Sequence, residues 1–168
     1  MRNLSNILAL SLILAACGAS TKSPATAAPK NAPAAAAGLK IKLTTVYVDD
    51  QDKALRFYTE VLGFAKKADF SNGPFRWLTV SSPEEPDGVE LQLALNDDPA
   101  ARAYQQALFQ QSRPAAMFYT GDVNSDYERI KARGAEFTMP PTEVTGSTIA
   151  MLNDTCGNRI QLIQLGRW

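Results

Sequence analysis

Hydrophobic and polar positions alternate in several short stretches between residues 41 and 165, and each stretch predicts a β-strand. The predicted strands cover 41–48, 65–69, 75–80, 89–95, 116–120, 136–139, 148–153 and 159–165. Apolar residues recur at helical spacing between Asp50 and Gly63 and again between Asp122 and Gly134, where an aspartate can cap the helix and a glycine can end it. A polar helical stretch over 99–111 separates the two sets of elements.

The order of one strand, one helix and three strands therefore occurs twice. Asp50 aligns with Asp122 at an offset of 72 residues, and Leu78 with Ile149 and Leu91 with Leu162 at 71. A nearly constant internal period indicates a duplicated structural unit. The sequence predicts an α+β fold in one domain over 39–168: a βαβββ module over about 40–96, a linker helix over about 99–111, and a second βαβββ module over about 114–166.

The first 38 residues differ from the rest in composition. Arg2 precedes a short apolar run that ends in Leu14-Ala15-Ala16-Cys17, which is typical of a signal peptide over 1–16 and too short for a membrane-spanning helix. Residues 17–38 are rich in alanine and proline, which predicts a disordered tether. An ordinary secretory signal with a chance cysteine and a soluble N-terminal helix are the alternatives.

The end of this leader resembles the bacterial lipobox. That resemblance implies lipidation of Cys17 and a lipid anchor in the bacterial cell envelope. Because Gly18 rather than Asp follows the cysteine, it also implies the outer membrane, with the domain facing the periplasm.

Charge and composition exclude several classes of function. The chain has 17 basic and 17 acidic residues, so no net positive charge favours nucleic acid as a partner. It has no histidine, which excludes serine triads, Cys–His dyads, HExxH zinc sites and histidine-based iron sites. Cys156 follows Asp154 in a turn with no histidine beside it, so an inert thiol is expected.

Two stretches resemble the vicinal oxygen chelate superfamily, which holds glyoxalases, extradiol dioxygenases and bleomycin resistance proteins. They are the segment from Val46 to Phe64 and the closing segment Gly157-Asn158-Arg159-Ile160-Gln161-Leu162. The resemblance implies two βαβββ modules whose mixed sheets curl around a cleft, and it implies a possible homodimer.

In metal-using members of that superfamily each module gives one ligand from its first strand and one from its last. The resemblance places the first-strand ligands at Leu43 and Ala115 and the last-strand ligands at Glu90 and Gln161. Only Glu90 retains a charged oxygen donor, whereas zinc or iron needs at least three protein ligands. The expectation is therefore a protein without a metal or another cofactor.

Alternation also predicts which sheet face lines the cleft. One face of each sheet should be apolar because it packs on the helix, and this face includes Val46, Leu78, Val89, Ile149 and Met151. The opposite face mixes aromatic, hydroxyl and amide groups, which is typical of a small-molecule site. The predicted ligand-binding residues are Tyr47, Trp77, Thr79, Glu90, Gln92, Met117, Tyr119, Thr148 and Gln161.

Three functions are compatible with these residues. The first is a small-molecule binding protein whose ligand is partly aromatic. The second is a glyoxalase- or dioxygenase-like enzyme, a lyase or an oxidoreductase, that uses Glu90 or an atypical metal site, although no cation near Glu90 would hold a developing oxyanion. The third is a non-catalytic scaffold for protein contact. The loss of the ligand positions favours binding over catalysis.

Overall fold

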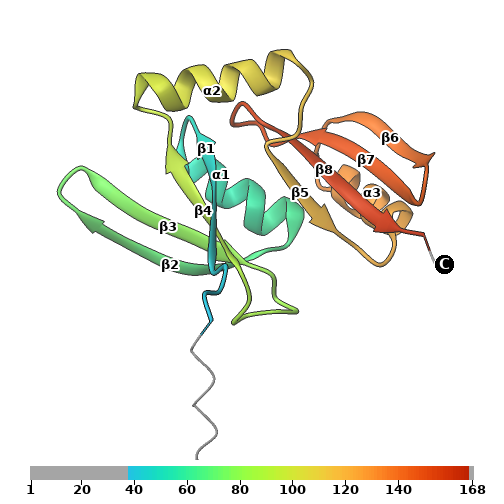
Figure 1. Cartoon of the computed structure of the whole chain (residues 1–168), viewed down its shortest axis with the longest axis horizontal. Coiled ribbons are helices and arrows are strands. Elements are labelled where there is room, and N and C mark those ends of the chain that lie inside the picture. Colours follow the sequence, from blue (N-terminus) through green and yellow to red (C-terminus); the bar gives the residue numbers. More distant parts are fainter. Residues whose placement is uncertain (1–37, 167–168) are drawn as a thin grey trace, which may run out of the picture. The chain divides into compact units, whose positions relative to one another are not determined.

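The strands of each predicted module pair into one four-stranded mixed sheet, as Figure 1 shows for residues 38–166, the part of the chain that this computed structural model describes. The predicted signal peptide and all but the last residue of the predicted tether lie outside these residues. In the first sheet, β1 runs parallel to β4 and the other pairs are antiparallel; in the second, β5 runs parallel to β8. The order β1-β4-β3-β2 joins β1 (Leu43–Val48), β2 (Ala65–Asn72), β3 (Phe75–Ser81) and β4 (Glu90–Leu95), and β5-β8-β7-β6 joins β5 (Ala116–Tyr119), β6 (Phe137–Val144), β7 (Ser147–Asn153) and β8 (Arg159–Leu165).

The first helix of each module begins at a predicted aspartate cap. Asp50 accepts a hydrogen bond from the Lys53 backbone N–H at the start of α1 (Gln51–Arg56), and Asp122 caps α3 (Val123–Ala132) in the same way. The first helix continues from α1 as a π-helix, η1 (Phe57–Leu62), which the spacing of apolar residues did not predict. It ends at Gly63, whose φ of +96° suits glycine.

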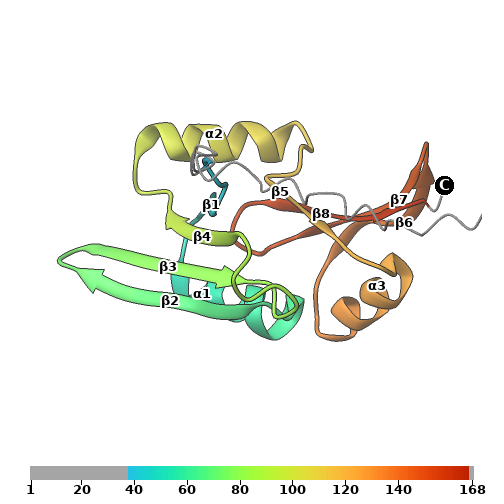
Figure 2. The same cartoon turned by 60° about the horizontal axis from the view of Figure 1, so that its bottom comes forward.

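One hydrophobic core joins the two modules. Tyr58 and Phe64 from the first module contact Phe118 on β5, with ring centroids 6.5 and 4.9 Å apart respectively. The helices α1, η1 and α3 lie on one side of the two sheets, whereas α2 (Pro99–Gln110) lies on the other side of the first sheet (Figure 2). The α+β fold of two βαβββ modules is therefore confirmed, and each sheet has one face covered by its helix.

The strand register corrects the predicted internal alignment. In the first sheet, Gln92 on the last strand lies between Thr45 on the first strand and Thr79 on the third. In the second sheet, Gln161 lies in the same way between Met117 and Met151. The offset is thus 72 residues for the first and third strands but 69 for the last. Gln92, and not Glu90, is the structural counterpart of Gln161, because the loop before β8 is shorter than the loop before β4.

The prediction for β7 is wrong about which side chains face the core. Ala150 and Leu152 are fully buried on the helix side, and Ile149 and Met151 share the other face with Gln161. Thr148 lies on the helix side, two residues before Ala150, so it does not belong to the predicted ligand-binding face. In the first module, Val89 is 47% exposed and lies before β4 rather than in the core.

Candidate functional site

The open face of the first sheet, which is the face turned away from α1, carries five of the predicted ligand-binding residues. The register places Thr79 and Gln92 side by side on this face, and strand alternation adds the others. Phe70 lies directly opposite Trp77 on β2 and so belongs to the same face. The five predicted residues on it are Tyr47, Trp77, Thr79, Glu90 and Gln92.

Two side-chain hydrogen bonds cross the strands in the middle of this face. Thr79 Oγ1 donates to Glu90 Oε2 over 2.7 Å, and Thr45 Oγ1 donates to Gln92 Oε1 over 3.1 Å. Thr79 is fully buried while Glu90 is half-buried, so one carboxylate oxygen is held in place and the other can accept a hydrogen bond from a ligand. The Gln92 amide nitrogen is a donor beside it.

An aromatic cluster of Phe70, Phe75 and Trp77 occupies the β2–β3 end of the same face. The Phe70 and Trp77 rings are stacked, with centroids 6.3 Å apart and planes 18° apart, and Phe75 lies 6.4 Å from Trp77. Phe70 is 58% exposed and Phe75 is 53% exposed. Neither phenylalanine was among the predicted site residues. Phe70 lies beyond the predicted end of the second strand at Asp69, and Phe75 was not assigned to the face although it alternates with Trp77 and Thr79.

The open face of the second sheet is more apolar. It carries the predicted residues Met117, Tyr119 and Gln161 together with Ile149 and Met151. Met117 is 54% exposed and Tyr119 is 69% exposed, which is unusual for such large apolar side chains in a sheet. A hollow of about 460 Å³ between the modules includes Tyr119 among its lining residues, but it opens along Phe64, Arg129 and Arg133 rather than along this face.

The positions at which superfamily members hold a metal do not supply a matching donor set. The resemblance places them at Leu43, Glu90, Ala115 and Gln161, and the register makes Gln92 the equivalent of Gln161. With either Glu90 or Gln92 counted, the set holds two hydrocarbon side chains and at most one carboxylate. Zinc and iron need charged or imidazole ligands in larger number. Within residues 38–166, no group of three or more His, Cys, Asp or Glu side chains could hold a metal ion.

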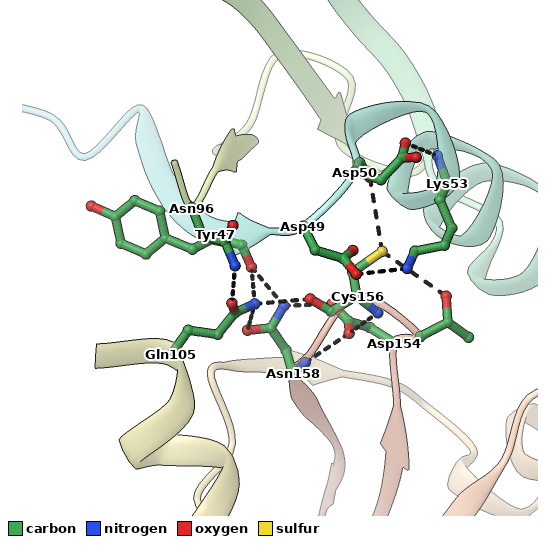
Figure 3. Close-up of polar contacts among 10 residues, drawn as sticks. Tyr47, Asp49, Asp50, Lys53, Asn96, Gln105, Asp154, Cys156 and Asn158 are labelled. Atoms are coloured by element: carbon green, nitrogen blue, oxygen red, sulfur yellow. Dashed lines mark hydrogen bonds and ion pairs between the residues drawn. The ribbon is translucent and has the colours of Figure 1, made fainter. Parts of the chain in front are cut away.

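A buried polar network joins β1, α2 and the turn between β7 and β8, and it anchors the backbone beneath the open face (Figure 3). Gln105 on α2 donates through Nε2 to the carbonyl oxygens of Tyr47 (2.7 Å) and Cys156 (2.9 Å), and Asn158 Nδ2 also donates to the Tyr47 oxygen (2.7 Å). Asn96 completes the set by donating to Gln105 Oε1 over 2.6 Å. This network could not be predicted from the sequence, because its members are spread between residues 47 and 158 and no local pattern links them.

Asp154 is the acceptor at the centre of the turn. It receives hydrogen bonds from the backbone N–H groups of Cys156 and Asn158, both at 2.8 Å, and from Asn158 Nδ2 at 2.7 Å. Burial raises the pKa of the Asp154 carboxyl above its ordinary value, and the bonds from Asn158 and Cys156 oppose this. Burial also raises the pKa of the Cys156 thiol to about 12, which suits the expected inert residue.

Comparison with known proteins agrees with the fold. A family model described as the glyoxalase/bleomycin resistance protein/dioxygenase superfamily matches residues 40–162. The chain is 49% identical over 126 residues to the uncharacterized protein YurT of Bacillus subtilis, covering 75% of this chain and 99% of YurT. It is 32% identical over 123 residues to the uncharacterized protein YetH of the same organism, covering 71% of this chain and 92% of YetH.

Two solved structures resemble the chain along most of its described length. The crystal structure of UcmS2 superimposes with a TM-score of 0.67 at 29% identity, covering 75% of this chain and 98% of UcmS2. TnmS3, described as an antibiotic binding protein from Streptomyces sp. CB03234, superimposes with a TM-score of 0.63 at 30% identity, covering 77% of this chain and 98% of TnmS3.

Proposed function

Because the chain belongs to the glyoxalase/bleomycin resistance protein/dioxygenase superfamily, we propose that it is a metal-free binding protein for a small, partly aromatic organic molecule. The observation that carries this proposal is the open face of the first sheet, where the aromatic cluster lies next to the Thr79–Glu90 pair. Stacking on Trp77 and Phe70 binds a ring, and Glu90 with Gln92 orients its polar groups.

Two further observations support binding over catalysis. TnmS3, at 30% identity over nearly its whole length, is itself an antibiotic binding protein. On the open face of the first sheet, Glu90 has no lysine or arginine hydrogen-bonded to it within the described residues, so no cation paired with it would stabilise an oxyanion.

A thermal-shift screen of the full chain against a library of aromatic natural products tests the proposal. We expect compounds that raise the melting temperature of the wild type and that lose most of this shift with Trp77→Ala and with Glu90→Ala. Glu128→Ala, which changes an exposed carboxylate on α3, serves as the matched control and should keep the shift. Hits that are indifferent to both site variants would refute the assignment of the open face, and stoichiometric zinc or iron in the purified protein would refute the metal-free part.

We also propose that two copies of the chain associate through their open faces, so that the first sheet of one copy and the second sheet of the other enclose the ligand. Exposed apolar side chains on both faces support this, among them Phe70 and Tyr119. Sedimentation equilibrium should give twice the mass of the chain, and Met117→Glu should shift it to the monomer. A wild type that stays monomeric at about 50 μM, a concentration at which ordinary specific dimers form, would overturn this proposal.

We propose in addition that the domain is anchored to the bacterial envelope by lipid on Cys17. The family match begins at residue 40, which supports a separate role for the preceding segment. Among the described residues no helix is long and apolar enough to cross a membrane. Cells fed a radiolabelled fatty acid should label the wild type but not Cys17→Ser, and label on that variant would refute the anchor.

A further inference from the structure

A hollow of about 570 Å³ lies where β4 leads into α2, next to the open face of the first sheet. Its volume falls within the range of small-molecule sites. Tyr47 from β1 and Tyr104 from α2 form its aromatic walls, and Leu95 and Asp97 line it where the chain leaves β4. None of these residues except Tyr47 was predicted to contact a ligand.

The two tyrosine rings contact each other in the wall of the hollow. Their centroids are 6.4 Å apart and their planes are 80° apart, so the edge of one ring meets the face of the other. The backbone of Tyr47 is fixed by hydrogen bonds from Gln105 and Asn158, and Figure 3 shows its ring pointing away from that network. Tyr104 is 58% exposed, which leaves most of its ring without a protein partner.

The charged groups that line the hollow are both acidic. Asp98 is occupied as the N-cap of α2, where it accepts from the Ala100 backbone N–H over 2.7 Å. The carboxylate of Asp97 makes no hydrogen bond or ion pair to any other described residue. Arg102 donates to the backbone oxygen of Asp97 over 3.4 Å, but neither it nor any other lysine or arginine lines the hollow.

We infer that this hollow binds the cationic end of the aromatic ligand, so that the ligand is an amine-bearing, positively charged ring system. The inference rests on the proposed function and names the ligand class. The tyrosine pair makes the hollow a binding site, because an ammonium or an iminium ring gains from contact with tyrosine faces. The carboxylate of Asp97 determines only that the bound end of the ligand is positively charged. Glu90 is a second acceptor for the ligand. Ala94 lies opposite Tyr47, and Glu90 lies four residues before Ala94, which places it about 13 Å away along β4.

Three tricyclic compounds of nearly equal area and different charge test this inference: 9-aminoacridine as the cation, acridone as the neutral compound and acridine-9-carboxylate as the anion. Their dissociation constants for the full chain are measured by isothermal titration calorimetry. We expect 9-aminoacridine to bind about tenfold more tightly than acridone, which is the scale of one partly screened charge contact. Asp97→Asn should remove most of that ratio, and Glu128→Gln should leave it unchanged.

The tyrosine variants separate this inference from the proposed function. Tyr104→Ala should weaken 9-aminoacridine severalfold while Tyr104→Phe keeps its affinity, because the ring and not the hydroxyl makes the contact. Equal or tighter binding of the carboxylate, or a ratio that Asp97→Asn does not change, would overturn the inference. If acridone binds and responds to Trp77→Ala but not to Tyr104→Ala, the inference fails and the proposed function stands. If none of the three compounds binds while the library gives hits that depend on Trp77 and not on Tyr104, the inference fails and the proposed function stands.

Discussion

The hydroxyl of Tyr58 donates a hydrogen bond to Asp154 Oδ2 over 3.2 Å, and this bond joins the helix of the first module to the turn before β8 in the second. Both residues are fully buried. Burial raises the pKa of Tyr58 well above its ordinary value, so the hydroxyl remains a donor at any ordinary pH. The contact therefore fixes the two modules to each other inside the shared core.

Removing this hydroxyl should destabilise the protein. Tyr58→Phe deletes a buried hydrogen bond to a carboxylate, and we expect the free energy of unfolding to fall by about 1–3 kcal/mol. Urea denaturation followed by circular dichroism measures the change. Tyr127→Phe is the matched control, because its hydroxyl accepts a bond from Lys131 at the surface, and its effect should stay within about 0.5 kcal/mol. Equal effects of the two variants would contradict the structural role of Tyr58.

The order of the elements and the ends of the two capped helices could be predicted from the sequence because the signals are local. The ends of β2 and β6 could not, since these strands continue past the predicted Asp69 and Met139 to Asn72 and Val144. Asp50, Gly63 and Asp122 mark helix boundaries by the chemistry of their own side chains and backbone. The face of β7 could not be predicted, since Ile149-Ala150-Met151-Leu152 is apolar at every position and alternation gives no preference. The burial of Ala150 and Leu152 is decided by pairing with Leu162 and Ile160.

The candidate site was predictable only in part, for the same reason. Trp77, Thr79 and Gln92 follow from alternation within single strands, and the structure places them together. Phe70 enters the site through pairing across a hairpin, and Tyr104 enters it through the position of a helix that contacts β1. Neither relationship leaves a periodic signal in the sequence. The counterpart of Gln161 also required the register, because the loops before the last strands differ in length.

The thiol of Cys156 should be unreactive in the folded protein. Its side chain is fully buried and its pKa is raised to about 12, so almost no thiolate is present at pH 8. In the Cys17→Ser variant, which leaves Cys156 as the only cysteine, Ellman's reagent should react with less than about a tenth of the thiol over an hour without denaturant. It should react completely in 6 M guanidinium, a denaturant that exposes buried groups. Rapid reaction of the native protein would show that the turn opens.

Asp69 should make stability depend on pH in the acid range. The Arg76 guanidinium donates to both of its carboxylate oxygens, at 2.8 and 3.0 Å, and lowers the pKa of Asp69 from 3.8 to about 2. A lowered pKa in the folded state stabilises the protein above pH 3.8, and this contribution is lost as the pH falls through about 2. The difference in melting temperature between the wild type and Asp69→Asn should therefore be present at pH 6 and shrink toward zero at pH 2, both within reach of a scanning calorimeter. A difference that is constant over this range would show that the ion pair between Asp69 and Arg76 does not contribute to stability.

Gln51 should bridge β3 and β4, and so fix their spacing, at the end of the sheet that carries Trp77. Its buried Nε2 donates to the carbonyl oxygens of Arg76 on β3 (3.1 Å) and Leu93 on β4 (2.7 Å). The pairing between the two strands is confined to Thr79–Gln92 and Val80–Leu91, so the side-chain amide takes over where the backbone ladder stops.

Gln51→Met keeps the length of the side chain but leaves both carbonyl groups without a donor. The free energy of unfolding should fall by about 2–4 kcal/mol, because one buried and one part-buried acceptor lose their hydrogen bonds. Gln106→Met on the exposed side of α2 is the control and should change stability by less than about 0.5 kcal/mol. If Gln51→Met is as mild as the control, the strands close on each other or admit water. In that case the spacing between Trp77 and Tyr47 does not depend on the amide, and ligand affinity should be unchanged as well.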